Sequence, residues 1–208
     1  MRGTRPRASE ICPGPLTKMV QARQWRHLSA AACLATAYFL ALLWSVPARA
    51  DGGGLEYAVK ATYLYKLAAF VTWPSSGLPL DAFVICVVGP SQVGTLLDRV
   101  VKGQTVQQRP VVVRRYASVI SNPGCQMMYV AGSGAQPVAD VLAAVRGAPV
   151  LTVTDGQDAA GATGIINFVV MDGRVRFEID EGAAAENGLV ISSKLLSLAV
   201  RVNPRRAG

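Results

Sequence analysis

The first pattern after residue 50 is an apolar stripe at helical spacing, which predicts a helix over Leu55–Val71. The stripe consists of small and aliphatic residues, namely Ala61, Leu64, Ala68 and Val71. The helix is expected to end before Trp73, because a residue that precedes proline is driven out of the helical conformation. Further aromatic residues make most sides of this helix apolar, namely Tyr57, Tyr63, Tyr65 and Phe70. Either core packing or a partner must cover such a helix.

Short apolar runs then alternate with helical segments. Continuous runs of this length are typical of buried strands. The predicted strands are Phe83–Val88, Pro110–Tyr116, Gln126–Val130 and Val150–Val153. Helices are predicted between them, at about Ser91–Val101 and Gln136–Arg146.

A hairpin follows, with arms at Ile165–Val170 and Arg174–Ile179 around the turn signal Asp172-Gly173. In the second arm apolar and charged residues alternate, which marks a sheet with one face in water. A Leu-rich segment after the hairpin predicts a last helix, with a stripe of Leu195, Leu198, Ala199 and Val202. The fold class is therefore α/β: a single-domain mixed sheet flanked by helices, a Rossmann-like sandwich with a C-terminal β-hairpin and helix.

The N-terminal segment has the features of a secretory signal peptide. Basic residues precede an apolar run over Leu28–Val46, and Pro47 and the small residues Ala48 and Ala50 follow it. We expect residues 1–50 to be removed, with Met19 as an alternative start, and residues 51–208 to form the mature domain in the periplasm. A membrane anchor is the alternative, because the apolar run is just long enough to span a bilayer.

Removal of this segment changes the charge of the protein. The whole chain has 21 Lys and Arg, 13 Asp and Glu and a net charge of +8. Seven of the basic residues and one of the acids precede residue 51, which leaves 14 against 12 and a net charge of +2. The basic character therefore does not indicate nucleic-acid binding.

The mature chain lacks histidine, because the single histidine is His27. This excludes a Ser-His-Asp or Cys-His mechanism and a His-ligated metal site, so we expect no enzyme, no metal and no cofactor. Cys86 and Cys125 are the cysteines that remain. In an oxidising compartment such a pair indicates one disulfide, which would pin two neighbouring strands. Two buried free thiols are the alternative.

Three motifs have candidate chemistry. Residues 132–134, a Gly-Ser-Gly turn between a strand and a helix, resemble a dinucleotide loop without its third glycine. With the turn at Gly89 they could frame a pocket for a small ligand. Glu178 and Asp180 share one face of a strand and could form an acid/base pair. A solvated strand edge is the simpler interpretation of these two carboxylates.

The third motif is the triplet of Ser192, Ser193 and Lys194. A serine/lysine pair on a helix needs a spacing of one turn, and adjacent residues point about 100° apart. The triplet is therefore interpreted as a helix start, where a serine caps free N–H groups.

Four segments together resemble the YfiR-like family of periplasmic proteins, in the right order and over essentially the whole mature chain. They are Lys60–Pro74, Ile85–Gly89, Val175–Ile179 and Gly188–Leu196. The resemblance implies an α/β regulator that tends to dimerise. The family's namesake represses an inner-membrane diguanylate cyclase by binding its periplasmic sensor region, which lowers cyclic di-GMP and biofilm formation. An outer-membrane, peptidoglycan-associated lipoprotein can sequester it.

The resemblance also sets expectations for sites. The namesake has two disulfides, and this mature chain has cysteines for one, which puts redox switching through a second bond in doubt. The first helix through Trp73 is the candidate partner or dimer surface, with Tyr65 and Phe70. Glu178, Ser192, Ser193 and Lys194 are further candidate contacts. A periplasmic small-ligand sensor of another signalling system is the alternative function.

Overall fold

The computed structural model describes residues 52–75, 81–131, 135–156 and 161–205. The expected signal peptide and the turn at residues 132–134 lie outside these ranges. Within them, no helix combines the length and the hydrophobicity that a membrane crossing requires.

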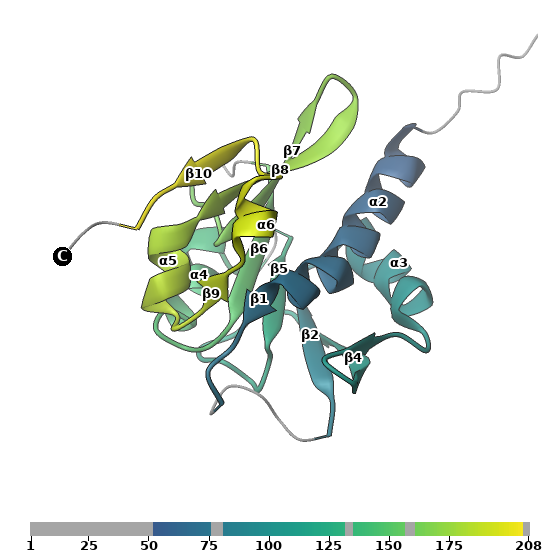
Figure 1. Ribbon diagram of the computed structural model, residues 1–208. Coiled ribbons are helices and arrows are strands. Elements are labelled where there is room, and N and C mark those ends of the chain that lie inside the picture. The colour runs from purple at the N-terminus through teal and green to yellow at the C-terminus, as the bar shows by residue number, and fades with distance from the viewer. Residues whose placement is uncertain (1–51, 76–80, 132–134, 157–160, 206–208) are drawn as a thin grey trace, which may run out of the picture. The chain divides into compact units, whose positions relative to one another are not determined.

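One mixed sheet organises the described part of the chain (Figure 1). Its eight strands lie in the order β10-β8-β7-β6-β5-β2-β4-β3. Their bounds are β2 (Phe83–Val88), β3 (Thr105–Val106), β4 (Arg109–Tyr116), β5 (Met127–Val130), β6 (Leu151–Asp155), β7 (Ile166–Met171), β8 (Arg174–Asp180) and β10 (Arg201–Asn203). Strands β4, β2, β5, β6 and β7 run parallel, whereas β8 is antiparallel to β7. The predicted α/β class is confirmed.

Helices and short elements connect these strands. They are α2 (Gly52–Leu67), the 3-10 turn η1 (Ala68–Phe70), α3 (Gln92–Val101), α4 (Val138–Ala144), α5 (Glu181–Glu186) and α6 (Ser193–Leu196). A separate antiparallel pair joins β1 (Val71–Thr72) to β9 (Val190–Ile191). This pair links the end of the first helical segment to the start of α6.

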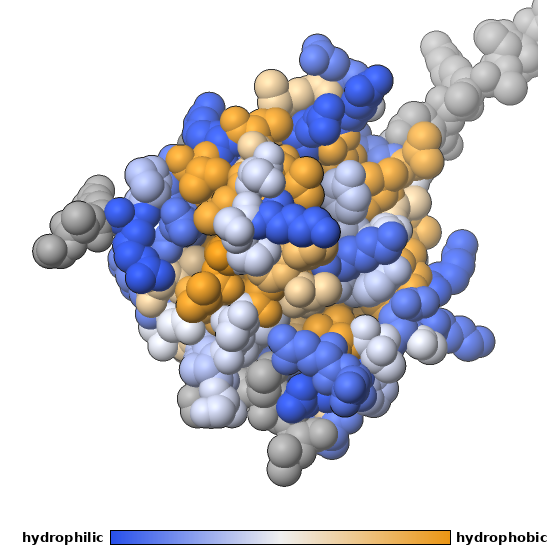
Figure 2. All heavy atoms as spheres, viewed as in Figure 1, coloured by the Kyte–Doolittle hydropathy of each residue, from blue (hydrophilic) through white to orange (hydrophobic). Residues whose placement is uncertain are grey.

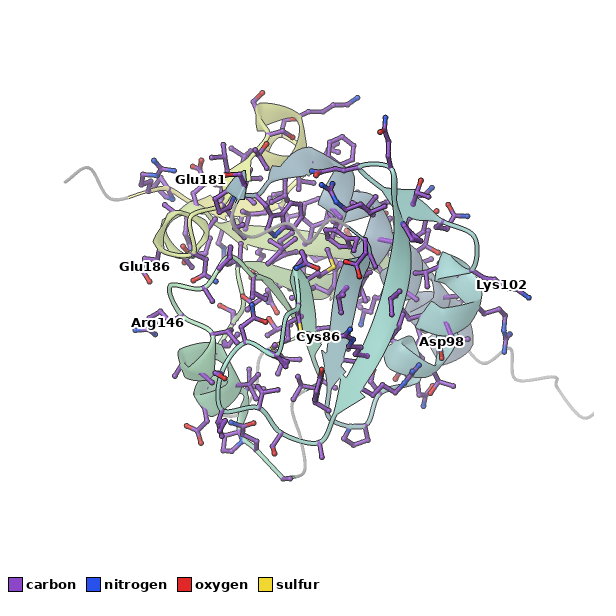
Figure 3. The ribbon with its side chains drawn as sticks, turned by 90° about the horizontal axis from the view of Figure 1, so that it is seen from below. Cys86, Asp98, Lys102, Arg146, Glu181 and Glu186 are labelled. Atoms are coloured by element: carbon purple, nitrogen blue, oxygen red, sulfur yellow. A yellow bond between two sulfur atoms is a disulfide. The ribbon has the colours of Figure 1, made fainter. Side chains whose placement is uncertain are left out.

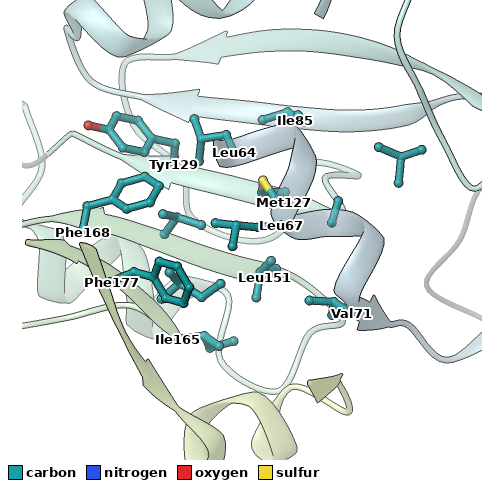
Figure 4. Packing of buried hydrophobic residues seen from close by; sticks show 14 of the residues in the cluster. Leu64, Leu67, Val71, Ile85, Met127, Tyr129, Leu151, Ile165, Phe168 and Phe177 are labelled. Carbon is teal, nitrogen blue, oxygen red and sulfur yellow. The ribbon is translucent and has the colours of Figure 1, made fainter. Parts of the chain in front are cut away.

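The larger hydrophobic core lies between the sheet and helices α2 and α3. The predicted stripe is buried there in full, but the α-helix ends at Leu67, so that Ala68 lies in η1 and Val71 in β1. Leu64 and Leu67 belong to one cluster with Phe168 of β7 and Phe177 of β8, and Leu67 lies beside Met127 from the middle of the sheet (Figure 4). The stripe is therefore a core contact that sets where α2 lies on the sheet.

A second core lies between the other face of the sheet and α4. It contains the alternate residues of β2 together with Val138 and Val141 of α4. The predicted disulfide is present here: Cys86 of β2 is bonded to Cys125, which precedes β5, and both residues are buried (Figure 3). The bond ties two adjacent parallel strands, as expected.

The hairpin β7–β8 forms as predicted. Asp172 and Gly173 both have positive φ, at 49° and 68°, which the tight turn between paired strands requires. Its apolar and charged residues separate to opposite faces, with Phe177 and Ile179 buried and Arg174 and Arg176 exposed.

The predicted C-terminal helix is much shorter than expected. It ends at Leu196, and Val202 of the predicted stripe lies in β10 instead, opposite Ile179. The backbone leaves the helix because the N–H of Val200 donates to the carbonyl of Phe177 at 2.9 Å. Pairing with the open edge of β8 thus overrides the helical periodicity that the sequence shows.

The disulfide is expected to stabilise the fold through the unfolded chain. It closes a loop of 39 residues, so that replacing both cysteines by alanine should lower the free energy of unfolding by about 3–4 kcal/mol in the chain-entropy model. Urea unfolding of the oxidised and the variant proteins measures the difference. Equal stability of the two proteins would contradict this account.

Candidate functional site

The candidate site is an open groove between α2 and the β7–β8 hairpin, extended to α6. It consists of two adjoining hollows of about 580 Å³ and 240 Å³ that share Tyr63, Val175 and Arg176. We call it the α2–hairpin groove. Its apolar lining consists of Leu55, Val59, Tyr63, Leu67, Phe70, Val170, Val175, Phe177, Leu195 and Leu198, and its charged lining of Glu56, Lys66, Arg174 and Arg176.

Helix α2 and η1 supply one wall of the groove. Leu55, Val59, Tyr63 and Phe70 recur at intervals of four, four and seven residues, which places them along one side of the helical segment. This side differs from the buried stripe beneath it. Tyr63 and Phe70 are half-buried, whereas Leu55 is 72% exposed. The apolar wall therefore becomes more open towards the start of α2.

The hairpin supplies the opposite wall through three cross-strand pairs on the face towards α2. The pairs are Ile166 with Ile179, Phe168 with Phe177, and Val170 with Val175. The first two pairs are buried, but Val170 is 49% exposed. One continuous apolar face thus runs from the core into solvent, where the described chain leaves it uncovered.

Helix α6 closes the end of the groove. Leu198, just after this helix, is 58% exposed, and the Lys194 ammonium lies 5.8 Å from the centre of the Phe70 ring. Figure 2 shows hydrophobic side chains gathered around α6 and beside α2, with hydrophilic ones among them. A patch of this kind on a protein surface is typical of an interaction site.

A buried ion pair fixes the wall that α2 forms. The ammonium of Lys60, with a side chain only 3% exposed, lies 2.6 Å from Oδ1 of Asp155 at the end of β6. It also donates to Glu56, one turn earlier in α2, at 2.5 Å. The hydroxyl of Tyr129 donates to the second oxygen of Asp155 at 3.1 Å. These four groups satisfy one another and tie α2 to the carboxyl ends of β5 and β6.

Two groups in this network have shifted pKa values. Burial would lower the pKa of Lys60, but hydrogen bonds and charges from Asp155 and Glu56 outweigh it and raise that pKa above its ordinary value. Burial and the Asp155 charge raise the pKa of Tyr129 above the usual range of tyrosine, against a hydrogen bond to Ser91. The folded state therefore holds the protons of both groups.

The structure brings only some of the predicted contact residues to the groove. Phe70 lines it and Lys194 lies against Phe70, whereas Tyr65 packs half-buried on the core and does not line either hollow. Trp73 is 4% exposed and does not belong to the surface. Its indole N–H donates to the carbonyl of Gln126 at 3.1 Å, and its ring packs edge-on against Phe83, so this part of the prediction is corrected.

The other predicted contacts serve local structure. Ser192 caps α6, with its hydroxyl accepting from the N–H of Leu195 at 3.3 Å, and Ser193 is exposed in the first turn. Glu178 points to the sheet face opposite to Phe177, where it meets Arg201 at 3.4 Å. The capping interpretation is confirmed for Ser192.

Sequence reasoning missed the residues that make the groove open, above all Val59, Val170 and Leu198. Each of them lies in a hydrophobic pattern that is equally typical of buried core residues. The available signal was the second apolar side of the first helix, which requires a cover beyond the sheet.

Replacing Asp155 by Asn should lower the free energy of unfolding by about 2 kcal/mol, because the buried ammonium of Lys60 loses a charged partner. Urea unfolding at neutral pH gives the value. Asp172→Asn is the matched control: the carboxylate is exposed in the hairpin turn, and its loss should change stability by less than about 0.5 kcal/mol. Equal effects of the two substitutions would refute the anchoring role.

Stability should fall as the pH rises above about 10, where the unfolded chain begins to release protons from Lys and Tyr that the folded chain retains. Both raised pKa values act in this direction, and their contribution is complete at neutral pH. Tyr129→Phe should make the alkaline loss shallower in urea titrations between pH 7 and pH 11. An unchanged pH dependence in this variant would contradict the assignment.

Comparison with known proteins identifies the family. A model of the YfiR/HmsC-like family matches residues 57–200, more than half of the chain, so the chain belongs to this family. Comparison with curated proteins gives no match. Membership suggests a periplasmic regulator of diguanylate cyclase signalling, in a family that is regulatory rather than catalytic.

Proposed function

We propose that this member of the YfiR/HmsC-like family represses an inner-membrane diguanylate cyclase by binding its periplasmic sensor region. Residues 1–50 direct export and are removed, and the mature domain acts in the periplasm. Repression lowers cyclic di-GMP and biofilm formation. The proposal rests on the family match and on the α2–hairpin groove.

The observation that carries the contact surface is the exposed end of an otherwise buried apolar face. Val170 continues the row of Ile166 and Phe168 but remains half in solvent, and Leu55 opposes it from α2. Burying apolar side chains is the main source of affinity at protein interfaces. A partner that covers this row completes the face.

The chemistry of the polar network supports binding rather than catalysis. Lys60 and Tyr129 both donate to the carboxylate of Asp155, and these bonds hold α2 in place. The mature chain has no histidine, and the described cysteines are joined in a disulfide. The shifted pKa values of Lys60 and Tyr129 are thus explained by their structural role.

Two further partners are proposed from the resemblance. A second copy of the chain forms a homodimer, and an outer-membrane, peptidoglycan-associated lipoprotein sequesters the protein and relieves repression. The alternative of a small ligand at the Gly89 turn stays a prediction, because residues 132–134 of the same site lie outside the described ranges.

The test compares cyclic di-GMP in cells that produce variants of the protein. Loss of the protein should raise cyclic di-GMP, and Val170→Glu with Leu198→Glu should reproduce that rise, because a carboxylate in the groove opposes apolar contact. The expected loss of partner affinity is about ten-fold or more. Mass spectrometry of nucleotide extracts measures the outcome.

Ile120→Glu is the matched control. Ile120 is an exposed aliphatic residue that does not line the groove, so its replacement should leave repression intact. All variants must reach the wild-type amount in the periplasm. Unchanged cyclic di-GMP on loss of the protein would contradict the proposed function, and a decrease would indicate activation instead of repression.

A further inference from the structure

We infer that the occupant of the α2–hairpin groove is one amphipathic helix of the partner, with acidic side chains on the flanks of its apolar stripe. The inference rests on the proposed function, in which the groove is the contact surface. It adds the conformation and the charge of the segment that binds there.

The length of the groove suits a helix. Its α2 wall extends from Leu55 to Phe70, a span of 15 residues or roughly 22 Å at the helical rise. A helix of about four turns matches this length. The apolar side chains on the wall repeat at helical spacing, so that a partner stripe with the same spacing can interdigitate with them.

The position of the groove in the layers also favours a helix. Helices α2 and α3 cover one face of the sheet, and the outer half of the hairpin continues that face beyond α2 (Figure 1). In that outer half Val170 is exposed, and its cross-strand partner Val175 is only partly buried. In α/β folds the cover of such a face is a helix laid beside its neighbours.

A strand is disfavoured as the occupant. Beside the groove, the edge of β8 is already used at Glu178–Asp180 by β10, and the carbonyl of Phe177 accepts from Val200. An added strand therefore finds no free edge on this part of β8.

The charges around the groove select an acidic partner. Lys66 lines it from α2, while Arg174 and Arg176 border it on either side of Val175, with side chains that belong to the outer face of β8. Within the described ranges none of the three takes part in an ion pair. Glu56 is the one acidic lining residue, and its carboxylate is already bonded to Lys60 at 2.5 Å. The groove therefore has an apolar floor with unpaired basic side chains at its border, which attract a helix with Glu or Asp on its flanks.

The probes are three synthetic peptides of roughly 18 residues, and the protein is the mature chain, residues 51–208. The first peptide is a helix with a Leu stripe and Glu flanks, the second has Lys flanks, and the third has Glu flanks with two central prolines that prevent a helix. Fluorescence anisotropy measures binding at low salt and at ~0.5 M salt.

The first peptide should bind about ten-fold or more tightly than the other two, and high salt should weaken it. Val170→Glu should remove this binding. Arg174→Glu with Arg176→Glu should abolish the preference for Glu flanks. Arg146→Glu is the matched charge reversal, because Arg146 is exposed but does not line the groove, and it should leave the preference unchanged.

Equal affinity for Glu and Lys flanks would overturn the inference, as would no saturable binding of the first peptide up to ~1 mM. A homodimer that Val170→Glu dissociates and that the peptide leaves intact would also overturn it, since the groove would then hold a second copy. If these outcomes accompany a rise of cyclic di-GMP on loss of the protein, the inference fails and the proposed function stands. If the first peptide binds selectively but loss of the protein does not raise cyclic di-GMP, the groove binds an acidic helix and the proposed function fails.

Discussion

The buried ammonium of Lys60 is the constraint on which the rest of the site depends. A charge that is removed from water is costly unless it is paired and hydrogen-bonded, so that the chain must bring carboxylates to it. Asp155 meets this need from the end of β6 at 2.6 Å, and Glu56 meets it from the preceding turn of α2. The position of α2 along the sheet is thereby fixed. Because the opposite side of α2 is apolar as well, the same contact also fixes one wall of the groove.

Much of the fold could be predicted from periodicity. The stripe from Ala61 to Val71 and the run Phe83–Val88 are buried as expected, because burial of such patterns is the main driving force of folding. The C-terminal segment shows where this reasoning stops. Leu195 to Val202 fits a helix, but the edge of β8 needs backbone partners, and long-range pairing with β10 decides the conformation. Local spacing does not contain that information.

The candidate site was less predictable than the fold. Trp73 is of a residue type that is common at protein interfaces. Its indole N–H nevertheless donates to a backbone carbonyl and its ring packs against Phe83, so that it lies in the core. Val170 shows the reverse, since its place in an alternating strand predicts burial and the hairpin instead extends it beyond α2. Whether an apolar side chain such as Val170 is buried depends on how far α2 reaches over the hairpin. The two walls, at Leu55 and at Val170, are more than 100 residues apart in the chain. The Cys86–Cys125 bond could be predicted because composition and compartment indicate it before any geometry is known.

The central claim is that the α2–hairpin groove contacts the membrane partner, and photo-crosslinking in living cells tests it most directly. A photoreactive amino acid at Val170 should capture an inner-membrane protein with a periplasmic sensor region and a cytoplasmic cyclase domain. The same amino acid at Ile120, exposed outside the groove, should not capture that protein. Capture from Ile120 but not from Val170 would show that the partner binds elsewhere and would contradict the account.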